Sequence, residues 1–245
     1  MVGTVVRVVV GLALVGLAGI FVMAALRDWR LWTVLRRTAP ITPDELAQAA
    51  RSGRLRGTLV AVQGVARPGP SGPLTSTVNG QVCVWHRHTV HHRRIRRGKD
   101  GRTRQSLRRR RVADVSSREP VLLAGTAARV ELRTHDLPMD KPTRAGVRVL
   151  PAQVTQTFPD VDGLMGSDLY VHREWIVHNG AKLYVLAEAI GSGGGIVLRR
   201  PAKGPAVVST RAGAALRRNR LTSAITGFLL TALAVSAAIA VFLFF

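Results

Sequence analysis

The sequence contains very little cysteine and few acidic residues. Of its 245 residues one is cysteine, Cys83, and 14 are acidic against 36 Lys and Arg, so the net charge is +22. A single thiol excludes an intrachain disulfide and a zinc site built from several thiolates. The sparse carboxylates leave no paired-carboxylate pattern, and no hydrolase or metalloprotease motif occurs. We therefore expect no catalytic residue, no metal site and no cofactor.

Two long uncharged apolar runs lie at the two ends of the chain, Val8–Leu26 and Leu221–Phe245. A membrane core about 30 Å thick is crossed by roughly 20 helical residues, so each run predicts a transmembrane helix. A cleaved signal peptide is the alternative for the first run, because Val22-Met23-Ala24 fits a small-residue cleavage pattern. The length of the run and the arginines after it favour a retained anchor.

Positive charge flanks both apolar runs on the side of the central region. Four arginines follow the first run closely, and three more precede the second. The positive-inside rule then places the central region in the cytoplasm and both chain ends at the opposite face of the membrane. The arginines in question are Arg27, Arg30, Arg36 and Arg37 for the first run and Arg217, Arg218 and Arg220 for the second.

The region between the two runs begins with a short predicted helix. Thr42 and Glu45 form a capping box around Pro43, an apolar stripe follows, and Gly53 is a stop signal. We divide the chain into a first transmembrane helix at 8–26, a juxtamembrane segment with the short helix at 27–53, a β domain at 54–209, a juxtamembrane helix at 210–220 and a second transmembrane helix at 221–245.

Short apolar or alternating runs separated by Gly and Pro predict a mainly antiparallel β domain, shaped as a barrel or a sandwich. A Pro- and Gly-rich loop at Pro68–Pro73 divides the first two strands. The candidate strands are Leu59–Val62, Gln81–Val90, Pro120–Leu123, Ala128–Leu132, Val147–Val154, Leu169–His178, Lys182–Leu186, Ile196–Leu198 and Ala206–Val208.

Asn179-Gly180 lies between two of these strands and predicts a type I′ hairpin turn that sets their register. In the strand after the turn, apolar side chains occupy every position of Leu183–Leu186. This pattern is typical of a strand that is buried on both faces.

Two sequence features are weighed as binding motifs and set aside. His86 and His88 share one side of a predicted strand, with His91 and His92 close by, but no Asp, Glu or Cys of suitable spacing completes a metal site. Gly191–Gly195 resembles a phosphate loop, but a strand-like run follows it instead of a helix, and the Lys-Ser/Thr pair is missing. We expect a hairpin connection there.

The segment His92–Arg111 carries eleven basic side chains and one acid, Asp100, for a net charge of +10. It cannot bury apolar surface, so we expect a mobile loop. One hypothesis is binding to anionic membrane lipid, and the alternative is a solvated insert; nucleic acid is disfavoured because the segment lacks aromatics for base stacking. The candidate anion-binding residues are Arg93, Arg94, Arg96, Arg97, Lys99, Arg102, Arg104, Arg108, Arg109, Arg110 and Arg111.

Several stretches, in this order between two membrane spans, resemble the GIDE family, whose central region is also called the BAM ("beside a membrane") domain. The resemblance covers nearly the whole chain and implies a β domain held between two transmembrane helices in a RING-less, bacterial-type member. The stretches are Gly64, Pro70–Leu74, Gln81–Trp85, Tyr170–Ile176, Gly180 and Leu183–Glu188.

The resemblance also implies a link to E3 ubiquitin or SUMO ligation, since eukaryotic members look like mitochondrial ligases with a RING finger after the second span. This sequence ends at Phe245 and has Cys83 alone, so we expect no RING in it. His86 and Ala187 depart from the residues usual in the family. In the eukaryotic members the domain faces the intermembrane space, which conflicts with the orientation predicted above.

The resemblance transfers no catalytic residue. Cys83 and Glu174 occupy family-like positions, where we expect a small core residue and a structural ion-pair member. The leading hypothesis is a membrane-tethered interaction or scaffold domain without catalysis of its own, with an unknown protein partner. The alternatives are a ligase-like protein that acts with a separate RING-bearing chain and a binder of anionic lipid surfaces.

Overall fold

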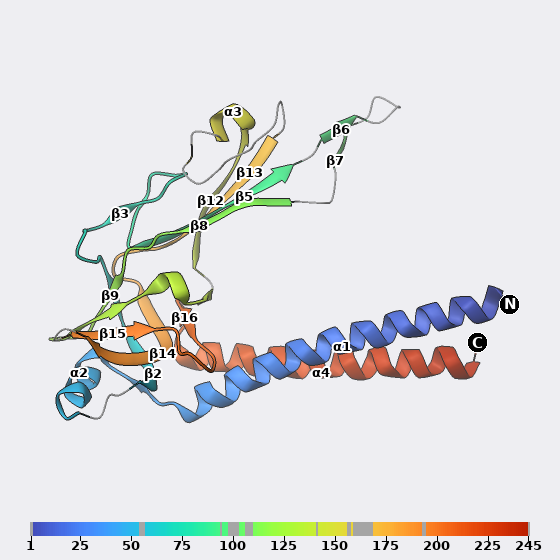
Figure 1. Cartoon of the computed structure of the whole chain (residues 1–245), viewed down its shortest axis with the longest axis horizontal. Helices are drawn as coiled ribbons and strands as arrows, with labels where there is room; N and C mark the ends of the chain where they lie inside the picture. Colours follow the sequence, from blue (N-terminus) through green and yellow to red (C-terminus); the bar gives the residue numbers. More distant parts are fainter. Residues whose placement is uncertain are drawn as a thin grey trace. The chain divides into compact units, whose positions relative to one another are not determined.

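Figure 1 shows the chain as a computed structural model that describes residues 2–53, 57–93, 95–97, 103–105, 110–140, 142–155, 158, 169–192 and 195–244. The chain divides into two compact units. One joins Met1–Ala39 to Ala212–Phe245, and the other comprises Pro40–Arg211. The first unit is helical and the second is mainly β, as the apolar ends and the strand-like middle of the sequence predict.

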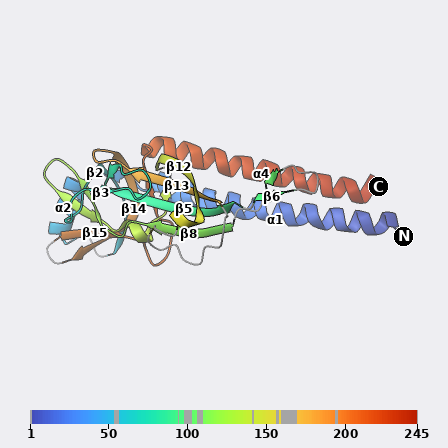
Figure 2. The ribbon, with the colours of Figure 1, turned by 90° about the horizontal axis from the view of Figure 1, so that it is seen from above.

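The helical unit is a pair of long helices, α1 (Val2–Arg37) and α4 (Gly213–Phe244), which lie side by side in both views (Figures 1 and 2). Each is long and apolar enough to cross a membrane. The segment after the first apolar run, Asp28–Arg37, is the continuation of α1. The segment before the second run likewise belongs to α4, so neither juxtamembrane part is a separate element.

Small residues bring α1 and α4 close together. A Cβ atom on Gly227 would lie 2.9 Å from the Cβ of Ala25, so a larger side chain does not fit there. Near the same level Asp28 accepts a hydrogen bond from Arg220, with 3.1 Å between Oδ1 and Nη1. Close backbone approach through small residues, with polar contacts between helices, is the usual way that helices associate in a membrane.

Five strands of the second unit close into a barrel. The ring runs in the order β2–β9–β10–β15–β14 and returns to β2, and only the β10–β15 pair is parallel. The structure therefore confirms the barrel alternative for the β domain. The bounds are β2 (Thr58–Arg67), β9 (Val121–Ala124), β10 (Arg129–Leu132), β14 (Lys182–Ser192) and β15 (Gly195–Arg199).

The barrel encloses the main apolar core. Leu123 and Leu132 contribute from β9 and β10, and Leu183 and Val185 from β14, all with at most 1% of their surface exposed. Tyr184 and Leu186 on the other side of β14 are equally buried, so the strand is covered on both faces, as predicted. β2 and β14 pair along eight residues, which forms the long seam of the barrel.

Short elements extend and cap the barrel. The helix α2 (Pro43–Arg51) begins with the predicted capping box, in which Thr42 and Glu45 bond to each other's backbone N–H, and Gly53 follows with φ +70°. Leu46 of α2 is fully buried in the barrel core. The additional strands are β1 (Pro40–Ile41), β11 (Met139–Asp140) and β16 (Val207–Ser209), and a 3₁₀ turn η1 covers Thr134–Asp136.

A separate four-stranded antiparallel sheet is formed by two segments that interrupt the order of the barrel strands. One segment lies between β2 and β9, and the other lies between β10 and β14. Figure 1 shows its strands as one layer. A short helix, α3 (Ala152–Thr155), follows its edge strand. The strands, in their order across the sheet, are β12 (Thr143–Pro151), β13 (Leu169–Val177), β5 (Trp85–Arg93) and β8 (Arg110–Ser116).

The turn at Asn179-Gly180 forms, but the predicted hairpin is wrong. Ala181 N–H donates to His178 O over 3.2 Å, and Gly180 has φ +85°, as a tight turn requires. However, β13 belongs to the four-stranded sheet and β14 to the barrel, so the two strands do not pair. The turn is instead held by Ala66, whose N–H and C=O bond to Ala181 and Gly180.

Two further predictions need correction. The run predicted as a strand over Val147–Val154 begins earlier, ends at Pro151, and continues as α3. The basic segment is not a loop throughout, because β6 (Ile95–Arg97) pairs with β7 (Thr103–Gln105) and β8 begins at Arg110. A backbone ladder satisfies the main-chain polar groups without burying side chains, so an Arg-rich stretch can still form strands.

Candidate functional site

The four-stranded sheet gathers most of the residues that could carry chemistry, and it separates them onto two faces. Successive side chains of a strand point to opposite sides, and residues paired across strands share a side. His88 pairs with Glu174, and Thr89 pairs with Arg173. One side, the histidine face, carries His88, His172 and Glu174; the other, the basic face, carries Arg87, Thr89, Arg111, Asp114 and Arg173.

Glu174 is a buried carboxylate that takes amide donors. It is fully buried and accepts hydrogen bonds from the backbone N–H of Val78 (3.0 Å) and Asn79 (3.1 Å) and from Asn79 Nδ2 (2.9 Å). The expected ion pair does not form among the described residues, where the neighbouring Arg173 points to the other face. Glu174 thus holds the turn that connects β3 (Leu74–Thr75) to β4 (Val82–Cys83), and its oxygens are occupied.

His88 and His172 form a buried hydrogen-bonded chain with Thr155. His88 Nε2 lies 2.9 Å from His172 Nδ1, and His172 Nε2 lies 3.0 Å from Thr155 Oγ1. Thr155 Oγ1 donates to Pro151 O, so it accepts from His172 Nε2–H. In a neutral His172 the Nδ1 is then an acceptor, and His88 Nε2–H is the donor to it.

Burial keeps these two histidines neutral. It lowers the pKa of His172 to about 4, with a further contribution from nearby His88. Burial also lowers the pKa of His88, against an opposing influence from Glu174. The ring of Phe158 lies 5.5 Å from His88 and 4.9 Å from His172 between centroids, which adds apolar cover. The chain of bonds is suited to holding α3 on the sheet.

The histidines do not gather into a metal site within the described part of the chain. His86 and His88 share a face, as predicted, and burial lowers the pKa of His86. His92 stacks on Tyr170 with 5.2 Å between ring centroids, and His91 points to the basic face. Among the described residues, no three His, Cys, Asp or Glu side chains lie close enough to hold a metal ion.

Cys83 is a core residue, as predicted. It has no exposed surface, and burial, followed by the nearby Glu174 charge, raises its pKa to about 11. The thiolate is the nucleophilic form of cysteine. The one thiol of this sequence is therefore protonated and covered at neutral pH.

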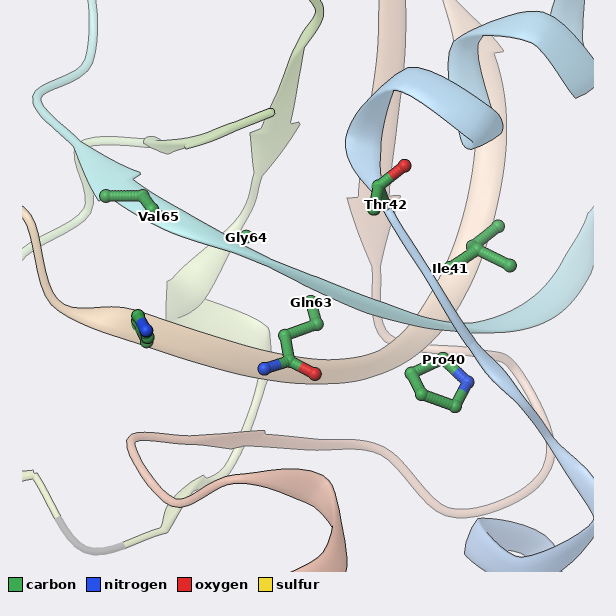
Figure 3. Close-up of a pocket in the computed structure, with 7 residues that line it drawn as sticks. Pro40, Ile41, Thr42, Gln63, Gly64 and Val65 are labelled. Atoms are coloured by element: carbon green, nitrogen blue, oxygen red, sulfur yellow. The ribbon is translucent and has the colours of Figure 1, made fainter. Parts of the chain in front are cut away.

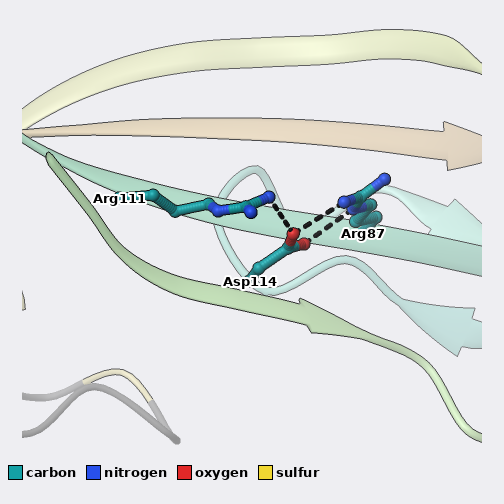
Figure 4. A network of polar contacts seen from close by, with 3 residues as sticks. All are labelled: Arg87, Arg111 and Asp114. Carbon is teal, nitrogen blue, oxygen red and sulfur yellow. Dashed lines mark hydrogen bonds and ion pairs between the residues drawn. The ribbon is translucent and has the colours of Figure 1, made fainter. Parts of the chain in front are cut away.

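The basic face has a network around a single carboxylate (Figure 4). Arg87 donates to both oxygens of Asp114, over 2.7 Å from Nε and 2.6 Å from Nη2, and Arg111 donates to the same carboxylate over 2.6 Å. The hydrogen bond to Arg87 lowers the pKa of Asp114 and raises that of Arg87. Asp114 thus stays ionised, and the positive charge around it is only partly compensated.

The structure places part of the candidate anion-binding set, and anion binding by these residues stays a prediction. Arg110 and Arg111 are exposed residues of β8, and Arg111 is engaged with Asp114. Arg93, Arg96, Arg97 and Arg104 lie on the described backbone of β5, β6 and β7. The remaining members of the set, Arg94, Lys99, Arg102, Arg108 and Arg109, lie outside the described residues.

A pocket that the sequence did not predict lies where β1 crosses beside β2 and β14 (Figure 3). Its volume is about 320 Å³, and its described lining residues include one ionisable side chain, Lys182. The Thr42 hydroxyl at its rim is already bonded to Glu45 over 2.9 Å. The described lining residues of the pocket include neither a carboxylate nor a histidine that could act as a general base.

The predicted hairpin at Gly191–Gly195 is confirmed by the pairing of Ser192 with Gly195.

Comparison with known proteins identifies the family. The GIDE family, described as E3 ubiquitin ligase, matches residues 88–243, from β5 through the four-stranded sheet and barrel into α4. No curated protein and no solved structure matches the chain. The match covers more than half of the 245 residues, and it includes the part of the β domain after residue 87 and the second apolar helix. The chain therefore belongs to the GIDE family.

Proposed function

We propose that this chain is a membrane-tethered interaction domain of the GIDE family, which holds a partner protein beside a bilayer and does not itself transfer a modifier. The observation that carries the proposal is the state of Cys83, the one thiol of the sequence. A covalent modifier carrier needs an accessible thiolate, and burial keeps this thiol protonated.

The remaining chemistry of the β domain supports the same proposal. The carboxylate of Glu174 is occupied by three N–H donors, and His172 is neutral and bonded at both ring nitrogens. Neither is within reach of a substrate in solution. The two apolar helices provide the tether, and the positive flanks favour a cytoplasmic position for the domain.

Photo-crosslinking in native membranes tests the interaction part of this proposal. A benzophenone amino acid is placed at the exposed β-domain positions Ser71 and Thr143, and at lipid-facing Leu229 of α4 as a control. We expect the same protein partner from a β-domain position in repeated preparations, and not from Leu229. Adducts from Leu229 alone would contradict a partner on the β domain.

The second candidate is a ligase-like role together with a separate RING-bearing chain, which the family description favours. It differs in one measurable respect. Addition of the chain to a reaction that already contains a RING protein would then increase modifier transfer to a captured partner. Under the leading proposal the chain leaves the transfer rate unchanged.

A further inference from the structure

The basic face of the four-stranded sheet has more positive charge than its own acid can neutralise. Arg87 and Arg111 share Asp114, whereas Arg173 has no ion-pair partner among the described residues. Arg144 on the edge strand β12 pairs with Trp175 and so belongs to the same face. The face thus carries four guanidinium groups, and its carboxylate, Asp114, is ion-paired with two of them, Arg87 and Arg111.

The centre of the basic face holds polar atoms that lack a partner. Thr89 is only 4% exposed, and its hydroxyl has no hydrogen-bond partner within the described structure. Arg173 lies directly opposite on β13, and its buried Nε is likewise unpartnered there. A buried polar group without a partner is destabilising, so an external acceptor that reached the Arg173 guanidinium would be stabilised there.

The edge strand adds an apolar strip beside the charges. Val147 pairs with Arg173, and Val149 pairs with Val171, so both valines lie on the basic face. They are 41% and 43% exposed. Val147 and Val149 are successive residues on this face of β12, about 6.6 Å apart. They form a short apolar strip beside Arg173 and on the same strand as Arg144.

We propose that the basic face and the edge strand β12, which among the described strands pairs with β13 alone, form a docking surface for an extended acidic segment of a partner protein. This inference rests on the proposed interaction function and names the chemistry of the partner. Carboxylates of the segment would lie against Arg144 of β12 and Arg173 of β13, while its apolar side chains contact Val147 and Val149. The backbone of the segment would pair with β12, the outer strand of the sheet.

Charge selects the acidic segment over other occupants. A second copy of this chain would bring arginines against Arg144 and Arg148 of the same edge, and like charges at an interface are repelled. A phosphate group would engage the arginines but would leave the exposed valines uncovered. An acidic strand satisfies both parts of the surface.

The test measures peptide binding to the full chain in nanodiscs of neutral phosphatidylcholine. The probe is a fluorescein-labelled peptide of 12 residues in which Glu alternates with Val or Thr; its control has Lys in place of Glu. The test variant is Arg144→Gln with Arg173→Gln. The matched control, Arg129→Gln with Arg200→Gln, removes the same charge from exposed positions elsewhere in the β domain.

We expect the acidic probe to bind and the Lys probe not to bind. The test variant should weaken binding by a factor on the order of ten, as for loss of a charge-assisted contact, and the control by less than about twofold. Because Arg173 is half-buried, Val147→Asp provides a second variant at an exposed site. Its carboxylate next to Arg173 should compete with the probe and also weaken binding.

Equal effects of the test and control variants, no binding of the acidic probe, or unchanged binding to Val147→Asp would each overturn the docking surface. Loss of binding to phosphatidylserine vesicles in the test variant, with peptide binding intact, would assign the face to lipid instead and would also overturn it. The crosslinking experiment separates the two proposals. If Arg144→Gln with Arg173→Gln still yields the same native partner, the interaction function stands and this surface is wrong.

Discussion

His88 and His172 lie on neighbouring antiparallel strands, both buried, with 2.9 Å between Nε2 and Nδ1. The hydrogen bond from His88 requires the Nδ1 of His172 to be unprotonated. The pair is 84 residues apart in the sequence, and it connects β5, β13 and α3 through Thr155. Protonation of His172 at Nδ1 would therefore break its bond with His88 and place a positive charge in a buried site, while Nε2–H could still donate to Thr155.

Acid should destabilise the β domain through this pair. Unfolded histidine takes up a proton near pH 6.5, whereas folded His172 resists protonation down to about pH 4. The unfolded state thus binds more protons between these values, so stability falls as the pH drops from about 6.5 toward 4 and then levels off. Urea unfolding of the full chain in detergent, followed by Trp fluorescence at several pH values, measures this.

Two variants show whether His172 causes the effect. His172→Gln should flatten the dependence between pH 6.5 and 4. His178→Gln, at an exposed position, should leave it unchanged. The same slope in wild type and His172→Gln would contradict the assignment.

Glu174→Gln should destabilise the β domain by about 1–3 kcal/mol, because the amide loses acceptor capacity where three N–H groups are directed at a buried carboxylate. The matched control is Glu131→Gln, whose ion pair with Arg133 is exposed and should contribute less than about 1 kcal/mol. Equal unfolding midpoints for the two variants would mean that the Glu174 bonds are unimportant for stability.

Gly180→Val should destabilise the turn between the sheet and the barrel by about 1–3 kcal/mol, the scale of a strained backbone position, because Gly180 has φ +85°. Gly191→Val is the control, since Gly191 lies in β14 without a left-handed φ and a Cβ there meets open space. The urea concentration at the midpoint of unfolding is measured for each variant, and it should fall for Gly180→Val and stay near the wild-type value for Gly191→Val. A drop for Gly191→Val alone would show that the turn tolerates a side chain.

Much of the secondary structure could be predicted because its signals are local. The capping box of α2 is contained within four residues, and the buried character of Leu183–Leu186 is visible in the strand itself. The length of the apolar runs likewise predicts helices able to cross a membrane. The burial of Cys83 followed from its place in an apolar strand.

The tertiary partners could not be predicted because they lie far apart in the sequence. Nothing near Asn179 indicates that β13 and β14 enter different sheets, since a turn signal fixes the bend and not the partner of each strand. Glu174 finds its donors in Val78 and Asn79, about a hundred residues earlier. β8 was missed because its charged side chains lack the alternation that predicts a buried strand.

The basic segment should bind anionic lipid without being required for folding. Replacement of residues 94–109 by a short Gly/Ser linker leaves the pairing of His92 with Arg110 in place. We expect an almost unchanged thermal midpoint and loss of co-sedimentation with phosphatidylserine vesicles at low salt. Neutral vesicles, which should bind neither form, are the control. Vesicle binding that persists after the replacement would locate the effect elsewhere.

The β domain should lie on the cytoplasmic side of the membrane. In a Cys83→Ser background, Ser71→Cys marks the exposed surface of the domain, and cysteines at Met1 and Phe245 mark the chain ends. An impermeant thiol reagent on intact cells should label the chain ends and spare position 71. Labelling at position 71 on intact cells would show that the β domain lies on the outer side of the membrane and would contradict the predicted orientation.

A conjugation assay decides whether the chain transfers a modifier itself. The purified full chain is combined with ubiquitin, its activating enzyme and a conjugating enzyme, with and without a separate RING protein, and Cys83→Ser is run in parallel. We expect no conjugates above the background of the conjugating enzyme unless the RING protein is added, and no difference between wild type and Cys83→Ser. Conjugates formed by the chain alone, above all if Cys83→Ser abolishes them, would contradict a non-catalytic interaction domain.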